Sequence, residues 1–299
     1  GKSPKAARRR RSMGSFAKAW SQLGNIAAAR LAAPATSNSS RGILQASVEN
    51  KTGLSRMLDS TLREGHDMKT FGLGTAASLA SVERYARFTA AMYHVYTAME
   101  SSLDAAKSPA VAPFWSSFGG DLRRSDALAL DLADVAASSS SHPPTPATRD
   151  YMRAIEAAGA KDEEDGGGRL IGHAYCRYFA DLMGGQFLAA PTRYALSPAV
   201  GEGTPRHYDF GAFGAERKAS VERLYASFNE AGDALASEAA RRAVVEEVLL
   251  AYRHNVAVYT EEGAVWSGAL RGAANLAGGV ARAKLQMPRA AAPSEAAAS

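Results

Sequence analysis

The chain has 299 residues, of which 46% are hydrophobic and 22% charged, and it carries a formal net charge of +5. This composition is typical of a folded globular protein with its own apolar core. A single cysteine excludes an intrachain disulfide and a cysteine-rich zinc site. No apolar run reaches the roughly 18 residues of a transmembrane helix, so none is predicted.

The positive charge is concentrated at the N-terminus. Nine Lys and Arg residues and no acidic residue precede Glu49, which leaves 26 basic against 30 acidic residues in the rest of the chain. We therefore expect no nucleic-acid partner, because a nucleic-acid-binding domain keeps a basic face. Residues 1–51 are predicted to form a basic extension, either an organelle transit peptide or a disordered tail. The four arginines at positions 8–11 could also contact an anionic membrane or partner.

Helical periodicity dominates residues 52–262 and predicts an all-α fold with a single helical domain. No segment alternates like a strand over a useful length. Three apolar faces are the clearest: one from Tyr85 to Leu103, one from Leu170 to Leu182, and one formed by Val245, Leu249, Tyr252, Val256 and Tyr259.

Local signals predict where several helices begin and end. Thr61 and Glu64 form a capping box, which predicts a short helix that ends at Gly72 and Gly74. Pro191 is predicted to end the helix that starts near residue 170. Residues 263–299 form a small-residue extension, for which a frayed tail is favoured over a weak amphipathic docking helix.

Residues 172–186, with the sequence GHAYCRYFADLMGGQ, carry the most informative pattern. Each Gly inside a helix costs about 1 kcal/mol relative to Ala, so the Gly184–Gly185 pair implies a kink or a close approach. Asp181 lies near the apolar face one turn earlier. Two interpretations stay open from the residues alone: tight helix packing, or a helix that bends beside a flat ligand and offers it one carboxylate.

This segment resembles the distal-helix motif of haem oxygenases. Residues 92–99 resemble the second-helix motif of the same family, and the similarity extends over residues 54–262, about 70% of the chain. The matching positions of the distal helix are Tyr175, Arg177, Tyr178, Asp181, Gly184, Gly185 and Gln186.

The resemblance implies haem bound between a proximal helix and a kinked distal helix, with O2 as co-substrate. The catalytic residues would be Asp181, which would order the water that supplies a proton, together with Tyr96 and Arg177. Gly184 and Gly185 would let the backbone approach the porphyrin. Further haem contacts are implied for Tyr175, Tyr252, Asn255 and Tyr259. Cys176 is interpreted as a small buried hydrophobe.

The proximal side departs from the family pattern. His66 is the candidate iron ligand, but an ungapped comparison places Thr70 in that position. A deletion of four residues, close to one helical turn, would restore His66 to the same face. The alternative is an ordinary surface or capping histidine.

The side that binds the haem propionates departs further. In the family, a Lys and an Arg one helical turn apart bind the two propionates. This sequence has Glu222 and Ala226 at the corresponding positions. A carboxylate would repel a propionate. Lys218 and Arg223 are the candidates that could compensate, and Arg217 is a further one.

Two main hypotheses follow. In the first, the protein is a plastid haem oxygenase that cleaves haem with O2 to biliverdin, iron and CO, using a ferredoxin-type electron donor; a mitochondrial location is less favoured. In the second, it is a scaffold or accessory subunit without turnover, joined through its terminal extensions to a larger membrane-associated or organelle complex. A helical-bundle enzyme for another substrate is a minor third hypothesis.

Overall fold

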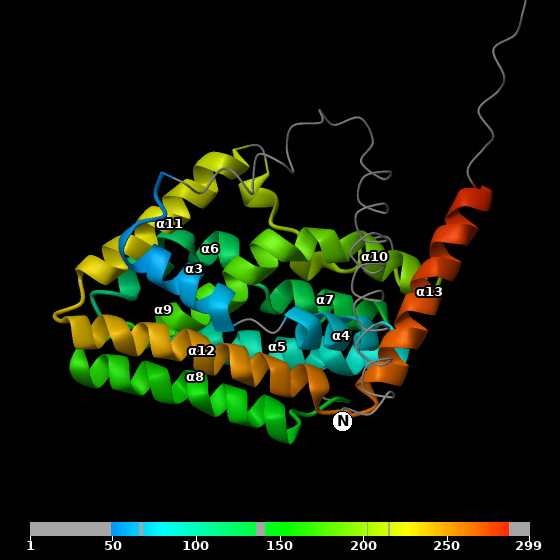
Figure 1. Ribbon diagram of the computed structural model, residues 1–299, viewed down its shortest axis with the longest axis horizontal. Coiled ribbons are helices and arrows are strands. Elements are labelled where there is room, and N and C mark those ends of the chain that lie inside the picture. The colour runs from blue at the N-terminus through cyan, green and yellow to red at the C-terminus, as the bar shows by residue number, and fades with distance from the viewer. Residues whose placement is uncertain (1–48, 66–67, 136–140, 202, 215, 287–299) are drawn as a thin grey trace, which may run out of the picture.

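The computed structural model describes residues 49–65, 68–135, 141–201, 203–214 and 216–286 (Figure 1). Every regular element within these ranges is helical, which confirms the all-α fold class. The α-helices, in chain order, are α3 (Gly53–Gly65), α4 (Met68–Ser78), α5 (Val82–Ala105), α6 (Ala112–Leu122), α7 (Ser125–Asp134), α8 (Pro146–Asp165), α9 (Arg169–Ala174), α10 (Gln186–Leu196), α11 (Arg217–Asp233), α12 (Glu238–Thr260) and α13 (Val265–Gln286).

Four short helical turns complete the list. Two are π-helical, η1 (Tyr175–Phe179) and η2 (Asp181–Gly185), and they join α9 to α10. Two are 3-10 helices, η3 (Arg206–Tyr208) and η4 (Gly211–Phe213), in the connection between α10 and α11. We call the run from α9 through α10, residues 169–196, the central segment.

The long helices α8 and α12 lie side by side along one edge of the molecule (Figure 1). The first part of the central segment packs against the three long helices α12, α8 and α5. The main apolar core surrounds it. Burial of this core is the dominant stabilising term, because each fully buried large apolar side chain contributes about 1.5–3 kcal/mol.

Two of the three predicted apolar faces are confirmed. In α5, Met92, Tyr96 and Met99 are fully buried, and Ser81 caps the helix by accepting a hydrogen bond from the Arg84 backbone N–H. In the central segment, every predicted position from Leu170 to Leu182 is buried.

The predicted face of α12 is confirmed in part. Tyr252 and Tyr259 are buried as predicted, whereas Val245, Leu249 and Val256 are only half-buried. Val244, Val248 and Asn255 are buried in addition. Asn255 therefore faces the interior of the domain, where its amide oxygen accepts a hydrogen bond from the central segment.

The predicted helix start at Thr61 and the predicted stop at Gly72 and Gly74 are also wrong. Thr61 lies within α3, and α4 passes through both glycines. A Cβ atom on Gly74 would lie 2.7 Å from the Cβ of Tyr259, so this glycine lets α12 approach α4. Helix packing therefore overrides the local propensity.

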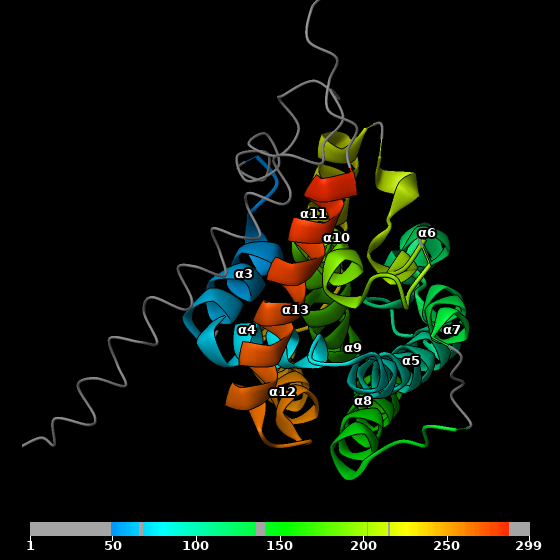
Figure 2. The ribbon, with the colours of Figure 1, turned by 90° about the vertical axis from the view of Figure 1, so that its right-hand side faces the viewer.

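The C-terminal extension is not frayed over residues 265–286, because α13 is a helix docked across α4 and α10 (Figure 2). A Cβ atom on Gly272 would overlap the carbonyl oxygen of Ala76, and one on Gly279 would overlap that of Tyr194. The absence of these side chains lets the backbone of α13 contact both helices directly.

Polar side chains of α13 also donate hydrogen bonds to backbone carbonyls that follow α4 and α10. Asn275 Nδ2 donates to the carbonyl oxygens of Leu79 and Ala80 at 2.9 and 3.1 Å, which satisfies the C-terminal end of α4. Arg282 donates to the carbonyl of Ser197, just after α10, at 3.0 Å. Leu276 is buried in a second, smaller apolar core. Within the described residues, no helix is long and apolar enough to cross a membrane.

Candidate active site

The central segment changes its helical geometry where the sequence predicts a kink. The α-helical hydrogen bonding of α9 gives way to the π-helical turns η1 and η2 before α10 begins. Turns of this kind are rare and occur frequently at functional sites. Pro191 does not end the helix as predicted, because α10 continues to Leu196. α10 also packs against α13.

Asp181 begins η2 and is the acceptor of a buried polar network. The Tyr96 hydroxyl donates to Asp181 Oδ2, and Arg177 Nη2 donates to the same oxygen at 2.9 Å. Arg177 Nη1 donates to Asn255 Oδ1 at 3.0 Å. All four residues are at most 5% exposed, so three helices bring these polar groups together away from bulk water.

Burial and charge together fix the protonation states of the two donors. Burial alone would lower the pKa of Arg177, but the adjacent Asp181 carboxylate and the surrounding tyrosines raise it well above its ordinary value. Burial, opposed in part by Arg177, raises the pKa of Tyr96 well above 10. Arg177 is therefore a cation and Tyr96 a neutral donor throughout the physiological pH range.

Asn255 connects this network to α8 and to the central segment. Its Nδ2 atom donates to the Ala251 carbonyl at 3.1 Å and lies 3.4 Å from both the Tyr151 hydroxyl and Cys176 Sγ. Burial raises the pKa of Cys176 to about 12, so its thiol stays protonated at neutral pH. This agrees with its interpretation as a small buried side chain.

The two adjacent glycines face different surroundings. Among the described residues outside its own helical turn, none lies within 4 Å of a Cβ atom built on Gly184, whereas a Cβ atom on Gly185 would overlap the ring of Tyr208 in η3. Gly184 thus leaves open space beside η2, and Gly185 allows close packing of a loop. The role of Tyr208 was not predicted, because it lies in a connection without periodicity and no local signal marks it.

The predicted aromatic residues lie in the central segment and in α12. The ring of Tyr175 stacks on Phe179 at 5.0 Å, and its hydroxyl is 3.5 Å from Asp59 Oδ1 in α3. Tyr259 packs on Phe88 with ring centroids 4.8 Å apart, and burial raises its pKa to about 12. Tyr252 is buried in α12, one turn before Asn255.

The proximal candidate His66 lies outside the described residues. α3 ends one residue before it, and α4 begins two residues after it. Thr70, the alternative position, belongs to α4. The sequence prediction for the iron ligand therefore stays a prediction.

The predicted propionate-binding residues lie on α11. Lys218 and Arg223 are exposed, and Arg223 donates to Ser220 Oγ at 3.0 Å. Glu222 is buried, and its Oε2 atom accepts the backbone N–H of Asn50 at 3.2 Å. Arg217 is half-buried and donates to the carbonyl oxygen of Leu182 in η2.

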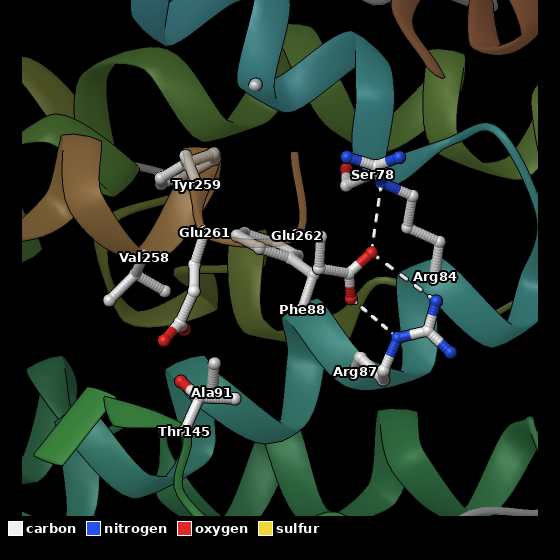
Figure 3. Close-up of a pocket in the computed structure, with 11 residues that line it drawn as sticks. Ser78, Arg84, Arg87, Phe88, Ala91, Thr145, Val258, Tyr259, Glu261 and Glu262 are labelled. Atoms are coloured by element: carbon white, nitrogen blue, oxygen red, sulfur yellow. Dashed lines mark hydrogen bonds and ion pairs between the residues drawn. The ribbon is translucent and has the colours of Figure 1, made fainter. Parts of the chain in front are cut away.

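A small cavity lies between α4, α5 and the end of α12, and Tyr259 forms part of its wall (Figure 3). Its volume is about 40 Å³, far below the roughly 300–1,000 Å³ of ligand pockets. Its two arginines are already paired, since Arg84 and Arg87 contact Glu262 at 3.2 and 2.5 Å. This cavity lies where these helices meet, and it is too small to hold a porphyrin.

Comparison with known proteins gives a consistent family assignment. The family model described as haem oxygenase matches residues 66–261. Haem oxygenase 1 of Gallus gallus is 31% identical over 218 residues, which cover 69% of this chain and 68% of that protein. The human protein of the same name is 32% identical over 176 residues, covering 58% of this chain and 57% of its own length.

Solved structures support the same fold. The haem oxygenase of Leptospira interrogans superposes with a TM-score of 0.58 at 24% identity, covering 70% of this chain and all of that one. Haem oxygenase-1 of Synechocystis, solved in complex with haem, gives a TM-score of 0.58 at 20% identity, covering 78% and 98% of the two chains. The chain belongs to the haem oxygenase family.

Proposed function

We propose that this chain binds haem beside η2 and opens its ring with O2 to give biliverdin, iron and CO. The observation that carries the proposal is the buried carboxylate of Asp181, which Tyr96 and Arg177 hold next to the open space at Gly184. A fixed, desolvated carboxylate is what a proton-delivery step requires. Haem supplies its own oxidative chemistry, and the protein positions it and controls protons around it.

The network assigns a task to each side chain. Tyr96 and Arg177 both donate to Asp181 Oδ2. The other carboxylate oxygen, Oδ1, is therefore the atom that would hold a proton-bearing water. Arg177 fixes the direction of the carboxylate and is itself fixed by Asn255. The hydroxyl of Tyr96 keeps its proton and stabilises the carboxylate as a neutral donor.

The residues fit haem on the side of the central segment and depart from the family pattern on the side of α11. Gly184 leaves room for a flat ring, and the donor set around Asp181 suits a polar ligand edge. On α11, Glu222 already accepts the N–H of Asn50. The cation that pairs with a haem carboxylate must therefore come from another position.

A titration with haemin, followed by turnover with a chemical reductant and O2, tests the proposal. We expect stoichiometric uptake with a sharp Soret band, then conversion to a biliverdin spectrum. Asp181→Asn should bind haemin like the parent and form biliverdin at least about 100-fold more slowly, the lower end of the contribution of acid–base catalysis. Asp121→Asn, at an exposed position, is the matched control. Equal turnover by Asp181→Asn and the parent would contradict the assignment.

The proposal extends to reduced ferredoxin as electron donor and to the plastid as location. It is supported by the family resemblance and by the acid-free composition of residues 1–48. A fluorescent protein fused after residue 51 should accumulate in the plastids of plant cells. Co-localisation with a mitochondrial marker instead would contradict the location.

The second candidate function is a scaffold without turnover. The observation that favours it is Glu222, a buried carboxylate on the helix where the family binds propionates with cations. The docked helix α13 lies outside the range that matches the family model and adds a further contact surface. A parent chain that gives no Soret band with stoichiometric haemin would favour the scaffold.

A further inference from the structure

Arg217, the first residue of α11, has a guanidinium group that lacks an acidic partner among the described residues. Its Nη2 atom donates to the carbonyl oxygen of Leu182, and its buried Nε atom has no hydrogen-bond partner there. Burial lowers the pKa of this guanidinium, and no carboxylate in the part of the chain that the structure describes offsets the effect. Removing a charge from water without pairing it is costly, so this position favours an anion.

Other partly buried arginines of the domain are compensated. Arg169 contacts Asp165 at 2.8 Å, and Arg206 contacts Asp134 at 2.5 Å. Arg124 forms no side-chain ion pair among the described residues, but all three of its guanidinium nitrogens donate to backbone carbonyls and the group stacks on Phe210 at 4.0 Å. Arg217 instead keeps an unused donor.

The unused donor of Arg217 lies close to η2, the turn that carries Asp181. Leu182 directly follows Asp181 in η2, and Gly184 in the same turn borders open space. The contact with Leu182 therefore holds the guanidinium at the turn that carries the candidate catalytic carboxylate. Glu222 and Ala226, which stand at the family's propionate-binding positions, cannot donate to an anion.

We infer that Arg217 pairs with a carboxylate of the bound porphyrin and replaces the cations that α11 lacks at positions 222 and 226. The inference rests on the proposed function, since it names the residue that orients the same substrate. The Nε–H group donates to the carboxylate, while Nη2 keeps its bond to Leu182. A hydrogen bond to a charged group contributes roughly 1.5–3 kcal/mol, which corresponds to about a tenfold to hundredfold change in affinity.

Two iron-free probes test this pairing without any contribution from iron ligation or turnover. Protoporphyrin IX carries both carboxylates, and its dimethyl ester carries none. Binding of each is measured by quenching of protein fluorescence in the full chain. We expect Arg217→Gln to weaken protoporphyrin IX about tenfold or more and to leave the ester unchanged, so that the discrimination between the two probes disappears. Arg217→Lys should restore part of it.

Control variants separate the possible failures. Arg242→Gln removes an exposed arginine from α12 and should behave like the parent. If Arg217→Gln discriminates between the probes as well as the parent does, the inference is overturned while the proposed function stands. If Arg223→Gln loses the discrimination instead, an exposed residue binds the carboxylate and the inference is likewise overturned. A parent chain that binds neither protoporphyrin IX nor haemin overturns both proposals.

Discussion

The central segment and α11 both border the candidate site, but they pair their polar groups in different ways. In the central segment, Asp181 and Arg177 form a buried ion pair, with further bonds from Tyr96 and to Asn255. On α11, Glu222 is bound by one backbone N–H, and its Oε1 atom has no partner among the described residues. The buried carboxylate of the first region has a cationic partner, whereas the buried carboxylate of the second has none among the described residues.

Breaking the ion pair of the central segment should have the largest effect. Arg177→Met leaves the Asp181 carboxylate buried without its cation, and we expect a loss of about 3–5 kcal/mol in the free energy of unfolding. Urea denaturation monitored by circular dichroism measures it. The double variant Arg177→Met/Asp181→Leu should recover much of the loss, because it removes both charges. A loss below about 1 kcal/mol for the single variant would show that the pair is not desolvated.

The two glycines of η2 should differ in how much stability is lost when each is replaced by Ala. Gly185→Ala should cost about 1–3 kcal/mol, since its methyl group must displace the ring of Tyr208. The methyl group of Gly184→Ala meets no described residue outside its own turn, so this substitution should change stability by less than about 1 kcal/mol, with Ala the better helix former. Thermal unfolding of both variants compares them directly. Equal losses would mean that Tyr208 does not press on this turn.

The buried thiol of the central segment predicts a dependence on alkaline pH. The pKa of Cys176 rises from 9.0 to about 12 on folding, so the folded chain holds this proton more tightly than the unfolded chain. Its contribution to stability is complete below pH 9 and falls as the pH rises toward 12, by about 1.4 kcal/mol per pH unit. Urea denaturation at pH 8 and pH 10 should therefore show a smaller decrease for Cys176→Ala than for the parent. Identical decreases would contradict the burial of this thiol.

The smallest effect is expected on α11. Glu222→Gln keeps an oxygen for the N–H of Asn50 and removes a buried charge, so the free energy of unfolding should change by no more than about 1 kcal/mol. The same denaturation assay compares it with Arg177→Met. A loss of 3 kcal/mol or more would show that Glu222 has a cationic partner and that the two regions are alike.

Several features of this protein were predictable from the sequence because they depend on local spacing. The helical period predicted the buried faces of α5 and of the central segment, and the Gly–Gly pair beside Asp181 marked the π-helical turns. The motif resemblance brought Tyr96, Arg177, Asp181 and Asn255 into one site, and the structure brings these side chains into one hydrogen-bond network. In each case the signal lies within a few residues or in a motif.

Tertiary contacts decided the rest. Asn255 of α12 accepts a hydrogen bond from Arg177, and these two residues are 78 positions apart in the chain. The docking of α13 depends on backbone atoms of α4 and α10 that meet its glycines. Local propensity carries no information about a partner that folding brings from elsewhere. For the same reason, only the tertiary structure shows that Arg217 has no acidic partner among the described residues.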